Sequence, residues 1–232
     1  MTCNFSQGQL LLIDKPQGWT SFDVVAKIRN LIKKHTGEKV KVGHAGTLDP
    51  LATGLLIIAT GKKTKTLNQL QGLDKEYIAE IRFGANTSTY DAESEIIETF
   101  PVDHLTENLV KQTILSFLGK QKQIPPRYSA KKIKGKKAYD LARKGEDFKL
   151  EPVDVEFKEI DILTMDLPDY VVVRLLVSKG TYIRSFAYDL GKKLGSGAYL
   201  SALRRTKTGD FNVNDALTIN QFEKNISICS NN

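Results

Sequence analysis

The sequence predicts a mixed α/β domain, because helical and strand patterns both occur along its 232 residues. Residues 20–32 carry apolar side chains at the spacing of a helix that buries one face. Residues 75–83 alternate as in a strand, which places every second side chain from Tyr77 to Phe83 on one face. Residues 55–59 form a short apolar run, which is typical of a buried strand.

The remaining elements are predicted from the same periods and from their end signals. Thr20 or Ser21 caps the first helix, and Asp23 lies favourably near its positive end. Thr106 caps a later helix, and Gly119 is a suitable residue just beyond its C-terminus. Further strands are expected at residues 10–13, 96–97, 153–163, 170–177 and 200–208, and further helices at residues 137–143 and 183–194.

The positive charge of the chain is unevenly distributed. The net charge is +7, and residues 120–144 contain many lysines and arginines but a single acid, Asp140. Tyr128 and Tyr139 lie among these cations, which suits a nucleic-acid surface that needs charge for phosphates and rings for bases. A solvated basic face is the alternative. We expect residues 121–150 to form a basic insertion that stands off the main sheet.

Composition excludes several classes of protein. The longest apolar runs are too short to span a bilayer, and the N-terminus lacks the pattern of a signal peptide, so a cytoplasmic protein is expected. The two cysteines and three scattered histidines predict neither a disulfide framework nor a metal site. Residues 60–64 are not a phosphate loop, because Leu56 and Lys63 occupy positions that such a loop reserves for Gly and for Ser or Thr.

The stretch GHAGTLDPLATGLL, residues 43–56, is the candidate functional loop. Its glycines permit close approach of other backbone or of a ligand. Pro50 disfavours helix at Asp49, which should therefore adopt an extended or turn conformation. The loop is expected to hold one acidic side chain in a fixed pose at the mouth of the sheet. The alternative is an ordinary glycine-rich connection whose Asp49 faces water.

Arg184 occupies an unfavourable place for a cation. It falls in the first turn of the predicted helix 183–194, where the helix dipole disfavours positive charge. A paired carboxylate would remove the penalty, and Asp49 is the natural candidate. A surface arginine without a partner is the alternative.

Five segments of the chain resemble the signature segments of bacterial tRNA pseudouridine-55 synthases, in the same order. They are KPxGxTS at 15–21, GHAGTLDPLATGLL at 43–56, PPxYSAK at 125–131, KGTYIRS at 179–185 and LRRTxxG at 203–209. The resemblance implies an α+β fold with a mixed, largely antiparallel twisted sheet, flanking helices and a basic RNA-binding insertion. It also implies one catalytic domain over residues 1–232.

The activity implied by the resemblance is isomerisation of uridine 55, in the T-loop of tRNA, to pseudouridine. The glycosidic bond breaks, the uracil turns, and a C5–C1′ bond forms, with neither cofactor nor metal. Two alternatives are a non-catalytic RNA-binding protein on the same scaffold and a uridine N-glycosidase that uses Asp49 with a second carboxylate such as Asp91. The glycosidase would release free uracil.

The resemblance also assigns roles to individual residues. Asp49 acts at the sugar, Arg184 pairs with it and keeps it ionised, and Tyr77 stacks on the target uracil. His44 occupies the space left by the extruded base, and Leu203 lines the opposite wall. Without the resemblance, Tyr77 and Leu203 would be interpreted as core side chains. The further residues expected to bind substrate are Lys15, Lys131 and Tyr182, with Lys132 and Lys134 as additional electrostatic contacts.

The chain departs from the family pattern in two places. Ser94 stands where relatives usually have glycine, close to Asp91 in a T-x-T-x-D segment. Relatives often carry a small C-terminal RNA-binding domain, and we expect this chain to lack one. The expected partner is the tRNA T-stem-loop, with no membrane or protein partner and a monomeric state.

Overall fold

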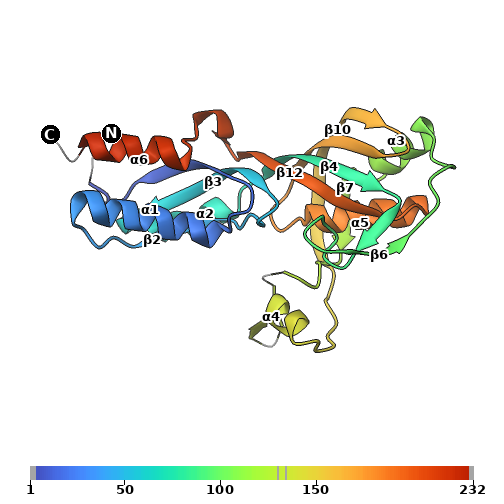
Figure 1. Cartoon of the computed structure of the whole chain (residues 1–232), viewed down its shortest axis with the longest axis horizontal. Helices are drawn as coiled ribbons and strands as arrows, with labels where there is room; N and C mark the ends of the chain where they lie inside the picture. Colours follow the sequence, from blue (N-terminus) through green and yellow to red (C-terminus); the bar gives the residue numbers. More distant parts are fainter. Residues whose placement is uncertain (1–3, 130, 134, 230–232) are drawn as a thin grey trace. The chain divides into compact units, whose positions relative to one another are not determined.

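The computed structural model describes residues 4–129, 131–133 and 135–229 (Figure 1). It divides into two compact units, one made of Met1–Tyr77 with Arg204–Asn232 and one made of Ile78–Leu203. Two strands, β4 (Lys75–Phe83) and β12 (Ala198–Thr208), have residues in both units. The prediction of one catalytic domain concerns the whole chain and stays a prediction. We describe each unit by itself.

The first unit is built around the buried strand β3, Thr53–Thr60. The strand β1 (Leu10–Lys15) pairs antiparallel with β3 over its full length, and β2 (Val42–Ala45) also pairs antiparallel with β3. The strand β12 adds a short parallel pairing, in which Arg204 and Arg205 lie opposite Thr53 and Gly54. The other elements of this unit are α1 (Ser21–Thr36), η1 (Gly61–Thr66), α2 (Leu67–Gln71), β13 (Phe211–Asn212), η2 (Val213–Asp215) and α6 (Ile219–Cys229).

The helix α1 begins as its N-terminal signals predict, and it continues to Thr36, four residues beyond the predicted stretch of residues 20–32. Thr20 is the N-cap: its hydroxyl accepts from the amide of Asp23 at 3.0 Å, and the Asp23 carboxylate accepts from the amide of Thr20 at 2.9 Å. This reciprocal capping box satisfies amides that the first turn leaves without helical partners. Gly37 ends the helix with a positive φ of 73°, a backbone conformation that favours glycine.

The second unit contains an antiparallel sheet, as predicted. Its long strand β10 (Val153–Asp166) pairs with β11 (Tyr170–Val177) on one side and with β7 (Gly119–Gln123) on the other. The helices α3 (Glu107–Leu115) and α5 (Ile183–Leu194) belong to this unit, and the packed rings of Phe117, Phe157 and Phe186 lie in its core. The strands β5 (Ala85–Thr87) and β6 (Ile96–Thr99) form a separate pair.

The basic insertion has structure of its own. The strands β8 (Lys132–Ile133) and β9 (Lys136–Lys137) form a short antiparallel pair, and α4 (Ala138–Arg143) follows (Figure 1). The helix predicted at residues 137–143 is therefore confirmed. Ala130 and Lys134 lie outside the described residues, and the Lys132 side chain is likewise not described.

Two expectations about element limits are wrong. Residues 42–45 form the strand β2, so the glycine-rich loop begins at Gly46 rather than at Gly43. A Cβ at Gly43 would lie 2.8 Å from Cδ1 of Leu67, the end of a flexible side chain that would have to shift, and Gly43 has no positive φ. The helix α3 ends at Leu115, short of the predicted Leu118, and Gly119 begins the strand β7.

Gly54 is expected to be the least replaceable glycine of the first unit's sheet. It has a φ of +99°, and an added Cβ would lie 2.3 Å from the carbonyl oxygen of Arg205. Gly54→Ala would place a Cβ on a residue with left-handed backbone angles and would also make it clash with the Arg205 backbone. It should therefore lower the free energy of unfolding by about 3 kcal/mol. Gly37→Ala is the matched control, because Gly37 also has a positive φ but no heavy atom within 4 Å. We expect a loss of only about 1 kcal/mol there. Equal losses in urea unfolding would contradict the clash.

Candidate active site

The loop that carries Asp49 is fixed by hydrogen bonds on both sides of this residue. The amide of Leu48 donates to the Ser21 hydroxyl at 2.8 Å, and that hydroxyl donates to the Leu48 carbonyl at 3.1 Å. The Pro50 carbonyl accepts from the amide of Gly18 at 2.8 Å, and the Asp49 carbonyl accepts from the amide of Ala52 at 3.1 Å. The half-buried Asp49 side chain therefore projects from a backbone with little freedom to move.

Lys15 lies beneath this loop and is fully buried. Its ammonium donates to the carbonyl oxygens of Trp19 at 2.6 Å, Pro16 at 2.8 Å and Pro50 at 3.4 Å. One cation thus joins the loop before α1 to the loop that carries Asp49. These bonds give Lys15 a supporting role, and its predicted contact with substrate stays a prediction.

Arg205 is a second buried cation beside the loop, and sequence analysis gave it no role. Its Nε donates to the Leu55 carbonyl at 2.7 Å, and one terminal nitrogen donates to the Gly46 carbonyl at 3.2 Å. Gly46 and Gly54, at the two ends of the loop, both lie against Arg205. The one signal in the sequence for this role is that Arg205 occupies a predicted strand position. An arginine buried there would need hydrogen-bond partners.

His44 lies in β2, immediately before Ala45 and the Asp49 loop. Burial lowers the pKa of its imidazole, and the nearby positive charge of Arg205 lowers it further, while a backbone hydrogen bond with Gly46 opposes the shift. The imidazole is therefore neutral at pH 7. Within the described residues, its Nδ1 atom is buried without a hydrogen-bond partner. The predicted place of His44 beside an extruded base remains a prediction.

Tyr77 belongs to β4, whose predicted alternation is confirmed. Every second residue from Tyr77 to Phe83 is buried. The adjacent carboxylate of Glu76 accepts from the Thr206 hydroxyl at 2.8 Å and lies 3.3 Å from the Lys207 ammonium, which ties β4 to β12 within the first unit. Stacking of Tyr77 on a uracil stays a prediction.

In the second unit, Arg184 occupies the first turn of α5 as predicted and is almost entirely buried. Its two terminal nitrogens donate to the carbonyls of Thr89 at 3.2 Å and Tyr128 at 2.9 Å. Its Nε lies 3.5 Å from a carboxylate oxygen of Asp91, a residue that is 1% exposed. Asp91 thus offsets the unfavourable dipole at this position. The predicted pair of Arg184 with Asp49 joins residues of the two units and stays a prediction.

The Asp91 carboxylate is held by the turn that contains it. Its Oδ1 accepts from the Thr89 hydroxyl at 2.5 Å and from the amide of Glu93 at 3.0 Å. The Ser94 hydroxyl accepts from the amide of Thr89 at 3.1 Å. The departure from glycine at position 94 therefore adds a hydrogen bond to the turn.

Tyr188, on the same face of α5 as Arg184, forms a stacked pair with Tyr90 from the turn that contains Asp91. Tyr188 follows Arg184 by four residues, and its ring stacks on that of Tyr90 with centroids 4.1 Å apart. Tyr90 has a φ of 65°, an uncommon conformation for a residue other than glycine. Burial raises the pKa of the Tyr90 hydroxyl, so it is neutral. The stack packs the turn with Asp91 against α5, a contact that no sequence pattern indicated.

The other predicted binding residues have distinct surroundings. Tyr182 is the N-cap residue of α5, and its amide and carbonyl both bond to the Gln123 side chain, at 2.8 and 3.0 Å. Leu203 is buried in β12. The Lys131 ammonium donates to the Glu151 carbonyl at 2.9 Å across the base of the insertion. Their roles toward substrate remain predictions.

Within the described ranges, no cluster of three or more His, Cys, Asp or Glu side chains could hold a metal ion. None of the helices that the structure describes is long and apolar enough to cross a membrane.

Comparison with known protein families identifies the chain as a pseudouridine synthase. The family model described as "TruB family pseudouridylate synthase (N terminal domain)" matches residues 33–183, and that of the "tRNA pseudouridylate synthase B C-terminal domain" matches residues 184–232. The chain therefore belongs to the TruB family of pseudouridylate synthases.

Its relatives include curated proteins of similar length. The chain is 50% identical to the tRNA pseudouridine synthase B of Phocaeicola vulgatus, over 94% of this chain and 93% of that protein. It is also 50% identical to that of Chloroherpeton thalassium, over 97% of this chain and 93% of that protein.

Solved structures show the same fold in larger proteins. A chain of a Cbf5-Nop10-Gar1 complex superposes with a TM-score of 0.71 at 29% identity, over 95% of this chain and 54% of that one. A chain of an H/ACA RNP bound to a substrate RNA containing 2′-deoxyuridine gives 0.67 at 27% identity, over 95% and 53%. This chain spans about half the length of those solved chains.

The neutral state of His44 predicts a pH dependence of stability. The unfolded chain binds the imidazole proton near the ordinary pKa of 6.5, whereas the folded chain binds it only at lower pH. The free energy of unfolding should therefore fall as pH drops below about 6.5, and His44→Gln should remove that part of the fall. Urea unfolding of both proteins at pH 7.5 and 5.5 measures the difference. An NMR titration midpoint for His44 at or above the ordinary value would refute the assignment.

Proposed function

We propose that this chain isomerises uridine 55 in the T-loop of tRNA to pseudouridine, with Asp49 as the catalytic carboxylate. The observation that supports it most is the fixed loop around Asp49, held by Ser21, Lys15 and Gly18, in a chain of the TruB family. Relatives with half of their residues identical are named tRNA pseudouridine synthase B. The position of the uridine and its place in the T-loop are parts of the proposal.

A fixed carboxylate suits this reaction because positive charge develops at C1′ when the glycosidic bond breaks. Asp49 stabilises that charge or captures it as a covalent adduct, as carboxylates do in glycosidases. An alternative route uses Asp49 as a base at the ribose. The N1–C1′ bond breaks, the base turns, and C5 bonds to C1′. C5 then loses its proton and N1 gains one, so composition and oxidation state are unchanged and no cofactor is needed.

The remaining site residues position the uridine. Tyr77 stacks on the extruded uracil, and Leu203 forms the opposite wall of its site. Arg184 is held by Asp91, Thr89 and Tyr128, and so presents a fixed positive charge to pair with Asp49. Extrusion of the uridine costs a few kcal/mol, which binding of the flipped nucleotide offsets. His44 occupies the space that the base leaves.

The partner is the tRNA T-stem-loop, bound by a monomer in the cytoplasm. The basic insertion contacts the phosphate backbone through Lys131 and its neighbours. Its base is joined to Arg184 within the second unit, because the Tyr128 carbonyl accepts a hydrogen bond from that guanidinium. No protein partner is required.

Asp49→Asn is expected to abolish pseudouridine formation without abolishing RNA binding. The amide keeps the shape of the side chain but removes the negative charge, so product should fall below about a thousandth of the wild-type rate. A chemical label selective for pseudouridine, applied to treated T-stem-loop RNA, measures the product. Filter binding measures affinity, and Asp103→Asn is a matched control because Asp103 is exposed in the turn before α3, in the second unit.

Two other outcomes would replace the proposal. If wild-type protein binds the RNA and forms no labelled product, it is an RNA-binding protein on the synthase scaffold. If it releases free uracil, it is an N-glycosidase, because isomerisation keeps the base in the polymer.

Salt dependence tests the insertion as the RNA clamp. The logarithm of the binding constant should fall linearly with the logarithm of salt concentration, with a slope of about −0.9 per duplex phosphate contact and about −0.7 for single strands. Replacing Lys131, Lys132 and Lys134 with alanine together should make the slope shallower by up to about 2.7 units if all three contact duplex phosphates, and by about 2.1 units for a single strand. Lys33, Lys34 and Lys39, which are exposed on the first unit, provide a control triple of equal charge. A slope that changes equally in both triples would contradict the clamp.

A further inference from the structure

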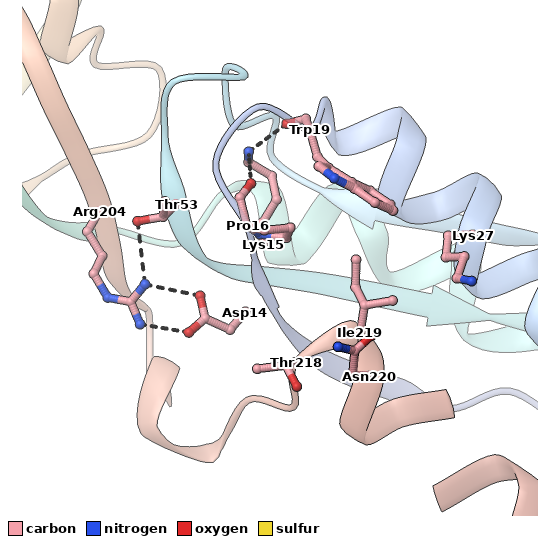
Figure 2. Close-up of a pocket in the computed structure, with 10 residues that line it drawn as sticks. All are labelled: Asp14, Lys15, Pro16, Trp19, Lys27, Thr53, Arg204, Thr218, Ile219 and Asn220. Carbon is pink, nitrogen blue, oxygen red and sulfur yellow. Dashed lines mark hydrogen bonds and ion pairs between the residues drawn. The ribbon is translucent and has the colours of Figure 1, made fainter. Parts of the chain in front are cut away.

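A pocket of about 470 Å³ opens in the first unit beside β1. Its lining side chains come from β1, β3, β12, the loop before α1, α1 itself and the start of α6 (Figure 2). The volume lies within the range of roughly 300–1,000 Å³ that is typical of small-molecule sites. Lys15 supports the Asp49 loop, and none of the other lining residues has a role in the reaction proposed above.

One wall of the pocket is aromatic. Trp19, the single tryptophan of the chain, is half-buried there. Figure 2 shows its ring on the α1 side, with Ile219 and Asn220 from the start of α6 on the opposite side. A flat aromatic ring can stack on any nucleobase, because every base has a π-face. Loss of such a contact weakens nucleic-acid affinity by roughly 5- to 150-fold per base.

The charges of the pocket are balanced. The Arg204 guanidinium forms a two-pronged pair with Asp14, at 3.1 and 2.8 Å, and also donates to the Thr53 hydroxyl at 3.4 Å. The Lys27 ammonium lies 3.5 Å from a carboxylate oxygen of Glu223. Because both solvent-reaching cations have carboxylate partners, the pocket favours a neutral planar ligand with polar edges over a free phosphate.

The hydrogen-bonding groups around the pocket suit the edge of a base. The Asn220 amide both donates and accepts, and the Asp14 carboxylate keeps acceptor capacity beyond its two bonds from Arg204. The Thr218 hydroxyl is already bonded to Gln221, donating to its side chain at 3.0 Å and accepting from its amide at 3.2 Å. All three line the pocket, and Thr218 and Asn220 are exposed.

The pocket is joined to the Asp49 loop. The Trp19 carbonyl and the Pro50 carbonyl accept from the same Lys15 ammonium, and Gly18 donates to Pro50 at 2.8 Å. The main chain at Trp19 and the main chain next to Asp49 are thus bonded to each other, and the second base is taken from a nucleotide near the uridine bound at Asp49. Covalent connection to the bound uridine raises the effective concentration of a second base at this surface.

We propose that this pocket binds a second, unpaired nucleobase of the tRNA substrate, which stacks on Trp19 while Asp14 and Asn220 bond to its edge. The proposal rests on the proposed function, because the RNA held at Asp49 supplies the base. It assigns Trp19 a binding role and no role in the chemical step.

The fluorescence of Trp19 tests the proposal directly, because no other tryptophan contributes to the signal. In the Asp49→Asn protein, saturating T-stem-loop RNA should quench or shift the emission, and should lower quenching by acrylamide about twofold or more. Unchanged emission and acrylamide quenching at saturation would overturn the proposal. Equal protection by free nucleoside monophosphates would also overturn it, since the site would then belong to a small molecule.

Substitutions give an independent measurement. Trp19→Ala should raise the Kd for the RNA about tenfold, and Trp19→Phe should largely restore the affinity by keeping an aromatic face. Phe22→Ala is the matched control, because Phe22 is 66% exposed on α1 and lies outside the pocket. In the presence of Asp49, Trp19→Ala should raise KM and leave kcat unchanged. Equal Kd values for Trp19→Ala and Phe22→Ala would refute the base site.

The two proposals fail in different ways. If Asp49→Asn still forms product, the proposed mechanism is wrong, yet fluorescence and Kd still report on the pocket. If Asp49→Asn abolishes product while Trp19 remains unaffected by RNA, the mechanism stands and the second base site is wrong.

Discussion

The structure of the Asp49 loop depends on one buried ammonium. Burying a charge is costly unless its donors are satisfied, and Lys15 satisfies its three N–H groups with carbonyls from two different loops. The same carbonyls would be left without this partner if the ammonium were removed. The ammonium therefore couples the loop before α1 to the loop around Asp49, and the capping of α1 by Thr20 extends the constraint into a helix.

In the second unit, Arg184 is the buried cation that joins separate segments, as Lys15 does in the first unit. Its planar guanidinium reaches the turn that contains Asp91 and the first residues of the basic insertion at the same time. A lysine could not make these bonds, because an ammonium lacks the fork of donors in fixed directions. The segments gathered around α5 thus share a single cation, and the Tyr90–Tyr188 stack reinforces their position one helical turn further on.

Sequence patterns predicted the elements whose stability is local. The start and the buried face of α1 followed from Thr20, Asp23 and the burial period, and β4 followed from strict alternation. The strand β7 was missed because its residues, GKQKQ, carry no apolar pattern, and only pairing with β10 makes them a strand. In the candidate site, the fixed loop was predictable from glycine and proline. The hydrogen bonds of Lys15 and Arg205 were not, because they depend on which distant carbonyls the fold brings within reach.

Buried and exposed cations have separate tasks in this chain. Lys15, Arg205 and Arg184 bond to main-chain carbonyls and so fix loops before any substrate arrives. Such preorganisation matters for a reaction that builds charge at C1′, because a carboxylate already in place needs no reorganisation when the bond breaks. Cations buried in this way cannot displace the counterions condensed on RNA phosphates, whereas exposed lysines of the insertion can. The excess of basic residues therefore overstates the electrostatic attraction of the chain for RNA. Part of that excess serves the structure, because it holds the loop of one carboxylate, Asp49, in place.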